Sequence, residues 1–120
     1  MTRFDGSLTP ALLVRDLEAT LAFYALLGFE PSGRWPDTGP ATWAEVRRDG
    51  VVLQFHTEPP VGMPTTPVLS GTLYLYVDDV DGLARELAGR VELTWGPETM
   101  DYGQRELGLR DPDGYVLAFA

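Results

Sequence analysis

The heptapeptide DGVVLQF at residues 49–55 returns as DGYVLAF at residues 113–119, with five of seven residues identical at an offset of 64. A second repeat precedes it. TPALLVRD at residues 9–16 and TLYLYVDD at residues 72–79 share Thr, Val and the final Asp at an offset of 63. Two matches in the same order and at nearly one offset indicate an internal duplication. Each half is then one supersecondary unit that must pack on the other to close a core.

Hydrophobic periodicity predicts the same order of elements in both halves. Asp16 and Asp79 are typical helix N-caps, and Gly28 is typical of a helix end. Residues 49–50 and 111–114 carry the Asp-Gly and Asp-Pro-Asp-Gly signals of tight turns. Each half therefore reads strand, helix and three more strands. The expected strands are 8–14, 29–35, 41–48 and 51–56, then 71–77, 91–95, 104–110 and 115–119, and the expected helices are 17–27 and 80–88.

The chain of 120 residues has the length of one domain. We expect this domain to contain a first unit at residues 1–57 and a second at 69–120. Residues 58–68 between them carry four of the ten prolines, which is typical of a linker.

Composition excludes several classes of function. Nine arginines against eighteen acidic residues give a net charge of −9, which repels the phosphates of nucleic acid and favours a cationic ligand. Without cysteine and with a single histidine, one chain offers neither a thiolate nor a His-pair zinc site. No apolar run approaches the ~20 residues that cross a bilayer, so we expect a cytoplasmic protein without a membrane partner.

Two motifs carry a resemblance to a known family. The helix segment LLVRDLEATLAFYALLGF at residues 12–29 and the hairpin YGQRELGLRDPDGYVLAF at residues 102–119 lie within the duplicated unit. Together they resemble the vicinal oxygen chelate superfamily, and within it the glyoxalase/bleomycin resistance protein group. The resemblance implies an α+β fold in which two tandem βαβββ units curl eight strands into an open half-barrel. The helices then lie outside and a ligand cavity inside.

The resemblance also identifies where metal enzymes of this superfamily carry their ligands. These positions correspond to Thr9, Gln54, Thr72 and Ala118. Two hydroxyls, an amide and a methyl group are a poor donor set for a divalent cation, which prefers imidazole or carboxylate. We therefore expect no metal and no other cofactor.

Strand alternation selects candidate ligand-binding residues. It points Gln54 and His56, and in the second half Tyr74 and Tyr76, toward the cavity. The resemblance adds Tyr102, which precedes a Gly-Arg-Glu run in drug-binding relatives, although here Gln104 is inserted in that run. Across both halves the candidates are Trp43, Glu45, Gln54, His56, Tyr74, Tyr76, Asp101, Tyr102 and Glu106.

Several candidates also have a structural interpretation. Alternating aromatic residues fill strands, a lone histidine often has no chemical role, and Glu106 can form an ion pair with Arg105 that fixes the hairpin. The acidic residues at 78–81 and 111–113 are read as helix caps and turn residues.

The leading hypothesis is a binding protein of the bleomycin-resistance type, which confers antibiotic resistance by sequestering a cationic, partly aromatic small molecule. The alternative is a glyoxalase-like lyase or a metal-free isomerase of the same fold, with His56 or Glu106 as the base. A purely structural domain is a third interpretation.

Because an open sheet leaves strand edges and tyrosines uncovered, we expect a homodimer.

Overall fold

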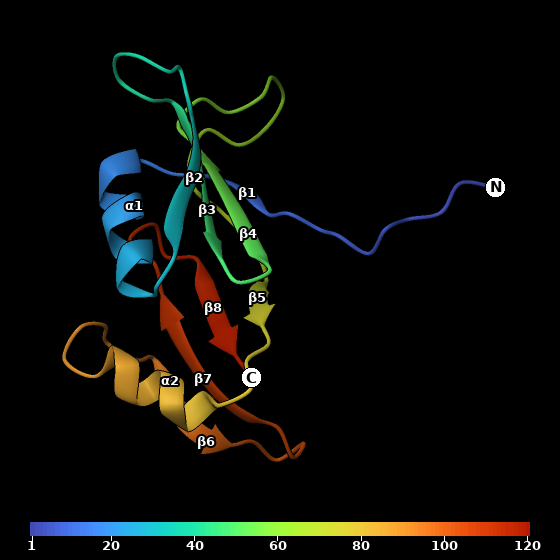
Figure 1. Cartoon of the computed structure of the whole chain (residues 1–120), viewed down its shortest axis with the longest axis vertical. Coiled ribbons are helices and arrows are strands. Elements are labelled where there is room, and N and C mark those ends of the chain that lie inside the picture. Colours follow the sequence, from blue (N-terminus) through green and yellow to red (C-terminus); the bar gives the residue numbers. More distant parts are fainter.

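A computed structural model describes residues 1–120, and it contains the duplicated unit twice (Figure 1). Asp16 and Asp79 cap the two helices through side-chain bonds to the backbone N–H of Ala19 and Gly82, as predicted. Neither helix is long and apolar enough to span a membrane. The first unit comprises β1 (Ala11–Leu13), α1 (Leu17–Leu26), β2 (Glu30–Trp35), β3 (Trp43–Arg48) and β4 (Val51–His56). The second comprises β5 (Thr72–Leu75), α2 (Val80–Leu87), β6 (Trp95–Thr99), β7 (Arg105–Arg110) and β8 (Val116–Phe119).

The eight strands form two mixed sheets of four, ordered β1-β4-β3-β2 and β5-β8-β7-β6. In each sheet the first and last strands of the unit pair in parallel, and the other neighbours are antiparallel. The equivalent registers Ala11↔Gln54 and Tyr74↔Ala118 reflect the repeat. The predicted α+β architecture is confirmed, with the strands divided between two sheets that do not close into a barrel.

Three strand predictions were wrong in extent, and the strand expected at 71–77 is shortened to β5 at Thr72–Leu75. The first strand was expected over residues 8–14, but β1 spans only Ala11–Leu13 because residues 1–9 are exposed and lead away from the body (Figure 1). The strand expected at 91–95 is instead β6, which begins at Trp95 and enters the segment between the strands expected at 91–95 and 104–110. A register shift between Trp95 and Glu98 breaks the alternation that reveals a strand, and Gly96 at φ 75° lies within it.

The core is one cluster that draws on both units. Leu53 and Phe55 of β4, and Leu117 and Phe119 of β8, are buried in it, as alternation predicts. The intervening residues lie on the other face of each sheet. The register of the two inner strands is therefore the predicted one, and the candidate residues fall on the face away from the helices.

A buried hydrogen bond joins the two units. The Tyr24 hydroxyl of α1 donates to Asp111 Oδ2 in the β7–β8 turn at 2.9 Å, and Tyr24 is fully buried. The other carboxylate oxygen accepts the backbone N–H groups of Asp113 and Tyr115 at 2.9 and 3.0 Å. Burial, together with the nearby Asp111 charge, raises the pKa of Tyr24 far above its usual value, so its hydroxyl remains a donor. The first helix is thus tied to the second hairpin.

We predict that Tyr24→Phe lowers the free energy of unfolding by about 1–3 kcal/mol, because it leaves a buried carboxylate oxygen without its donor. Urea denaturation measures the change. Tyr76→Phe is the matched control, since that side chain is 73% exposed, and it should change stability by less than about 0.5 kcal/mol. Equal losses in the two variants would show that the Tyr24–Asp111 bond does not hold the units together.

Candidate functional site

A cavity of about 900 Å³ borders residues of both sheets and of the N-terminal segment. Glu45 of the first sheet lines it together with Tyr74 of β5 and Tyr76, which follows that strand. The tyrosines lie nearly parallel, with ring centroids 6.4 Å apart and planes inclined by 23°. Both rings are exposed, at 42% and 73%. The structure therefore brings three of the candidate residues together around a space large enough for a small molecule.

Glu45 is held by polar side chains of its own sheet. Gln54 Nε2 donates to Glu45 Oε2 at 3.0 Å, and Ser32 Oγ donates to Oε1 at 3.0 Å. Arg47 lies 3.6 Å from the same carboxylate. The bonds from Gln54 and Ser32, followed by the Arg47 charge, outweigh burial and lower the pKa of Glu45. Glu45 is thus an ionised acceptor, and Gln54 acts mainly as its donor.

A second carboxylate, that of Glu106 on β7, is buried, with 2% of its surface exposed. Trp95 Nε1 donates to one carboxylate oxygen at 3.2 Å, and Gln104 Nε2 donates to the other at 3.1 Å. The side chains of Tyr74 and Tyr102 lie near the same carboxylate. Burial acts to raise the pKa of Glu106, but the hydrogen bonds from Gln104, Tyr102, Trp95 and Tyr74 together outweigh it, so the pKa is lowered.

Sequence reasoning missed Trp95 and the role of Gln104. Trp95 pairs with Gly108 on β7, and its indole ring lies over that glycine, where a Cβ would overlap the ring. Two small residues, Gly108 and its β8 partner Ala118, thus separate Trp95 from Tyr74 across the sheet. A tryptophan paired with a glycine across a hairpin indicates that the indole ring covers the glycine. The register shift at Gly96 conceals this pairing in the sequence.

Tyr102 and Asp101 lie in the turn between β6 and β7, and both are exposed. The hydrogen bond to Tyr74, burial and the adjacent Glu106 raise the pKa of Tyr102 well above its usual value. Arg105 does not pair with Glu106, contrary to the structural interpretation. It forms bonds of 2.7 and 3.1 Å to Asp81 at the start of α2, because consecutive strand residues point to opposite faces.

Two other candidates lie apart from the tyrosines. His56 lines a separate cavity of about 340 Å³ beneath the proline-rich linker, and its buried Nδ1 has no hydrogen-bond partner. Trp43 pairs with both His56 and Trp35, and its ring lies against Gly33. The structure therefore does not place His56 beside Glu106 or Tyr102.

The four positions that correspond to metal ligands do not fit a divalent cation. Gln54 donates its amide to Glu45, and Ala118 offers only a buried methyl group. Thr9 and Thr72 border the 900 Å³ cavity but carry only hydroxyls. No group of three or more His, Cys, Asp or Glu side chains in the chain has the arrangement of a metal site.

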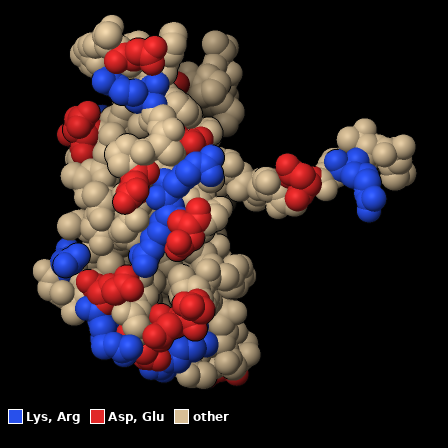
Figure 2. Space-filling model, in the orientation of Figure 1, with Lys and Arg blue, Asp and Glu red and all other residues tan.

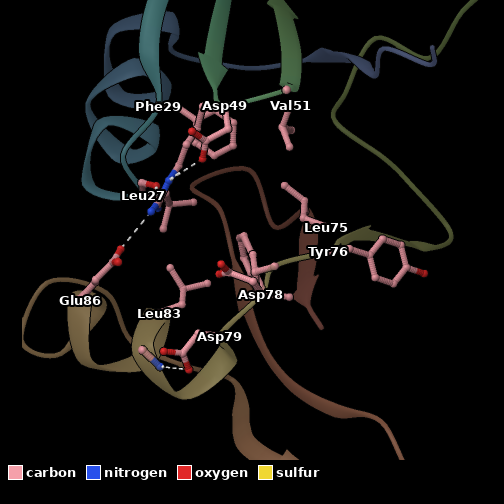
Figure 3. Close-up of a pocket in the computed structure, with 15 residues that line it drawn as sticks. Leu27, Phe29, Asp49, Val51, Leu75, Tyr76, Asp78, Asp79, Leu83 and Glu86 are labelled. Carbon is pink, nitrogen blue, oxygen red and sulfur yellow. Dashed lines mark hydrogen bonds and ion pairs between the residues drawn. The ribbon is translucent and has the colours of Figure 1, made fainter. Parts of the chain in front are cut away.

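A further cavity of about 630 Å³ opens between the units and shares Gly50, Val51, Leu75 and Tyr76 with the 900 Å³ cavity (Figure 3). Phe29 and Val51 of the first unit face Leu75 and Leu83 of the second, while the Tyr76 ring points away. Arg48 spans its edge and bonds to Glu86 at 3.1 Å. Neither Glu45 nor Tyr74 lines this cavity.

The charges are not gathered into one patch on the face drawn in Figure 2, where acidic and basic side chains lie interspersed. Many arginines are engaged by acidic neighbours, as in the pairs Arg15–Asp113, Arg48–Glu86 and Arg105–Asp81. These arginine charges are therefore neutralised locally by acidic side chains.

Comparison with known proteins identifies the family. The profile of the Glyoxalase/Bleomycin resistance protein/Dioxygenase superfamily matches residues 7–119. The chain belongs to this superfamily, as the two sequence motifs predicted. A search of curated protein sequences finds no match.

Solved structures share the fold along nearly the whole chain. A bleomycin-binding protein complexed with bleomycin is 26% identical, with a TM-score of 0.68 over 94% of this chain and 95% of the other. A bleomycin resistance determinant encoded on the transposon Tn5 is 29% identical, with a TM-score of 0.67 over 94% of each chain. A lactoylglutathione lyase from Agrobacterium tumefaciens is 20% identical, with a TM-score of 0.72 over 98% of this chain and 94% of that one. The last likeness shows the fold alone.

Proposed function

We propose that this chain is a cytoplasmic binding protein that sequesters a cationic, partly aromatic small molecule without transforming it. The observation that carries the proposal is the buried, hydrogen-bonded Glu106 carboxylate among the rings of Tyr74, Tyr102 and Trp95. Aromatic faces attract cations, and a fixed negative charge among them favours a positively charged ligand. The bleomycin-binding protein and the bleomycin resistance determinant that share the fold support this ligand class.

The chemistry of the candidate bases favours binding over catalysis. A general base is most effective when its pKa lies near the working pH. The pKa of Glu106 is lowered, because its hydrogen bonds outweigh burial, and its oxygens already accept from Trp95 and Gln104. His56 lies in a different cavity. These features support sequestration over the isomerase and lyase alternatives.

We also propose that the protein is a homodimer in which the uncovered sheet faces of two copies meet. Residues 1–9 extend from the body with Met1, Phe4 and Leu8 more than 90% exposed, and Tyr74 and Tyr102 are also exposed (Figure 1). Such exposed apolar residues typically mark an interaction surface.

Light scattering at micromolar concentration should therefore give twice the one-chain mass of 13.2 kDa. A single species with the one-chain mass would contradict this proposal.

We predict that bleomycin and the simple cation naphthylmethylammonium raise the melting temperature, whereas the anion naphthylacetate, of matched size, does not. Tyr102→Ala should weaken binding of the cation about tenfold, equivalent to ~1.4 kcal/mol, because it removes one ring of the site. The Tyr102 side chain is 65% exposed, so the variant should retain its stability. Titration calorimetry measures the affinities.

The titrations should be repeated at high salt, which screens long-range attraction by the net charge and leaves ring contacts largely intact. Equal affinity for the cation and the anion would contradict the proposed function. Undiminished affinity after Tyr102→Ala would show that the ligand binds elsewhere.

A further inference from the structure

The cavity of about 340 Å³ beneath the proline-rich linker is separate from the other two cavities. All three residues of β1 line it together with Tyr115, and from the linker Pro59, Pro60 and Met63 contribute to its wall. None of its lining residues borders the 900 Å³ or the 630 Å³ cavity. A molecule bound here would therefore not touch the residues that line either of those cavities.

His56 is the polar residue of this wall whose hydrogen-bonding capacity the protein leaves unused. Its Nδ1 is buried and has no hydrogen-bond partner, and it is the only such side-chain atom in the chain. A buried polar atom without a partner costs free energy comparable to a lost hydrogen bond. The Tyr115 hydroxyl, by contrast, donates to the Leu13 carbonyl at 2.6 Å. Because Nδ1 is shielded from bulk water, its partner has to come from the cavity that the ring lines.

The wall of this cavity carries no charged side chain. Leucine, alanine, valine, proline and methionine supply most of it, and Thr66 and Tyr115 are its only polar residues besides His56. Moving an ion into such surroundings is costly when no opposite charge lies nearby. The cavity therefore favours a neutral molecule, in contrast to the cation of the proposed function.

The linker side of the cavity is incompletely packed. Met63, Val68 and Leu69 line it, yet they remain 58%, 63% and 44% exposed. Exposed apolar residues that gather beside a cavity are typical of a binding surface. Three prolines of the linker also line the cavity, and their rings restrict the backbone there. A restricted wall loses little conformational entropy when a ligand binds against it.

Volume and hydrogen bonding together define the class of ligand. An apolar cavity of about 150 Å³ holds benzene, so one of about 340 Å³ has room for a molecule of two fused rings. A hydroxyl group both donates and accepts, and it therefore matches a neutral imidazole whichever nitrogen carries the proton.

We propose that the cavity beneath the linker is a second ligand site, which takes a compact, neutral aromatic alcohol. The rings of the ligand contact β1 and the apolar side chains of the linker, and its hydroxyl bonds to Nδ1 of His56. The site is independent of the proposed function, because it shares no lining residue with the cavity that Tyr74 and Tyr76 border.

Nuclear magnetic resonance of the ¹⁵N-labelled imidazole tests the hydrogen bond in the unaltered protein. The chain has a single histidine, so the ring nitrogen signals report on His56 alone. We expect 2-naphthol to shift the Nδ1 resonance in a saturable manner. Naphthalene, which has the same rings and no hydroxyl, should bind and leave that resonance nearly unchanged. An Nδ1 resonance that stays in place while 2-naphthol binds would overturn the inference.

His56→Phe keeps a ring at this position and removes both nitrogens. We expect the affinity for 2-naphthol, measured relative to that for naphthalene, to fall about five- to tenfold, as the loss of one hydrogen bond predicts. Thr66→Val is the matched control, because it removes another polar group from the same wall. Thr66 is exposed and can bond to water, so this ratio should change by less than about twofold. Equal losses in the two variants would contradict the assignment to His56.

A pair of linker variants tests the location of the site if His56→Phe does not fold. Val68→Trp adds bulk to the cavity wall and should weaken binding of both 2-naphthol and naphthalene about tenfold or more. Val61→Trp is its control, since Val61 is fully exposed and does not line the cavity, and it should change either affinity by less than about twofold. Full affinity in Val68→Trp would show that the molecules bind elsewhere.

Competition separates this inference from the proposed function. Naphthylmethylammonium should not displace 2-naphthol, and Tyr102→Ala should leave the affinity for 2-naphthol unchanged. Displacement of one molecule by the other, or a protein that does not bind 2-naphthol, would overturn the inference and leave the proposed function standing. A protein that binds 2-naphthol beside His56 but fails to bind the cation would contradict the proposed function alone.

Discussion

The buried bond from Tyr24 to Asp111 sets the position of one repeat against the other, and the candidate site depends on that position. It links the first helix to the hairpin turn of the second unit, and the nearby bond from the Tyr115 hydroxyl to the Leu13 carbonyl at 2.6 Å adds a second link. Arg15 and Asp113 form an ion pair at the same junction. Because these contacts lie on the core side, the opposite sheet faces remain open and bring Glu45 near Tyr74 and Tyr76.

Buried carboxylates serve two different purposes in this chain. For Asp111, burial outweighs the hydrogen bonds from Tyr24 and the backbone, and the pKa is raised. A raised pKa in the folded state means that this group favours folding more as the pH falls through that value toward the ordinary one. For Glu106 the donors outweigh burial and the pKa is lowered, so its contribution is present above its ordinary pKa and is lost in acid. Asp111 joins the two units, whereas Glu106 stays charged beside exposed aromatic rings.

The duplication predicted most of the fold, because each repeat carries its own cap, helix and hairpin signals. Both caps, the hairpin at Asp49 and the buried alternation of β4 and β8 follow from local patterns. Local patterns did not reveal Trp95, because the shifted register at Gly96 interrupts the alternation. They also placed His56 on the correct face without indicating that the linker separates it from the tyrosines. Alternation determines the face of a sheet, while the packing of distant segments determines which residues share a cavity.

In the proposed function, a cationic aromatic ligand binds beside Glu106, among the rings of Tyr74, Tyr102 and Trp95. Nuclear magnetic resonance of the ¹⁵N-labelled protein during titration with naphthylmethylammonium tests it most directly. We expect the indole N–H resonance of Trp95 and the backbone amides of Tyr74 and Tyr102 to shift progressively and saturate together. Shifts confined to Phe29, Leu83 and Glu86, which line the 630 Å³ cavity between the units, would contradict it.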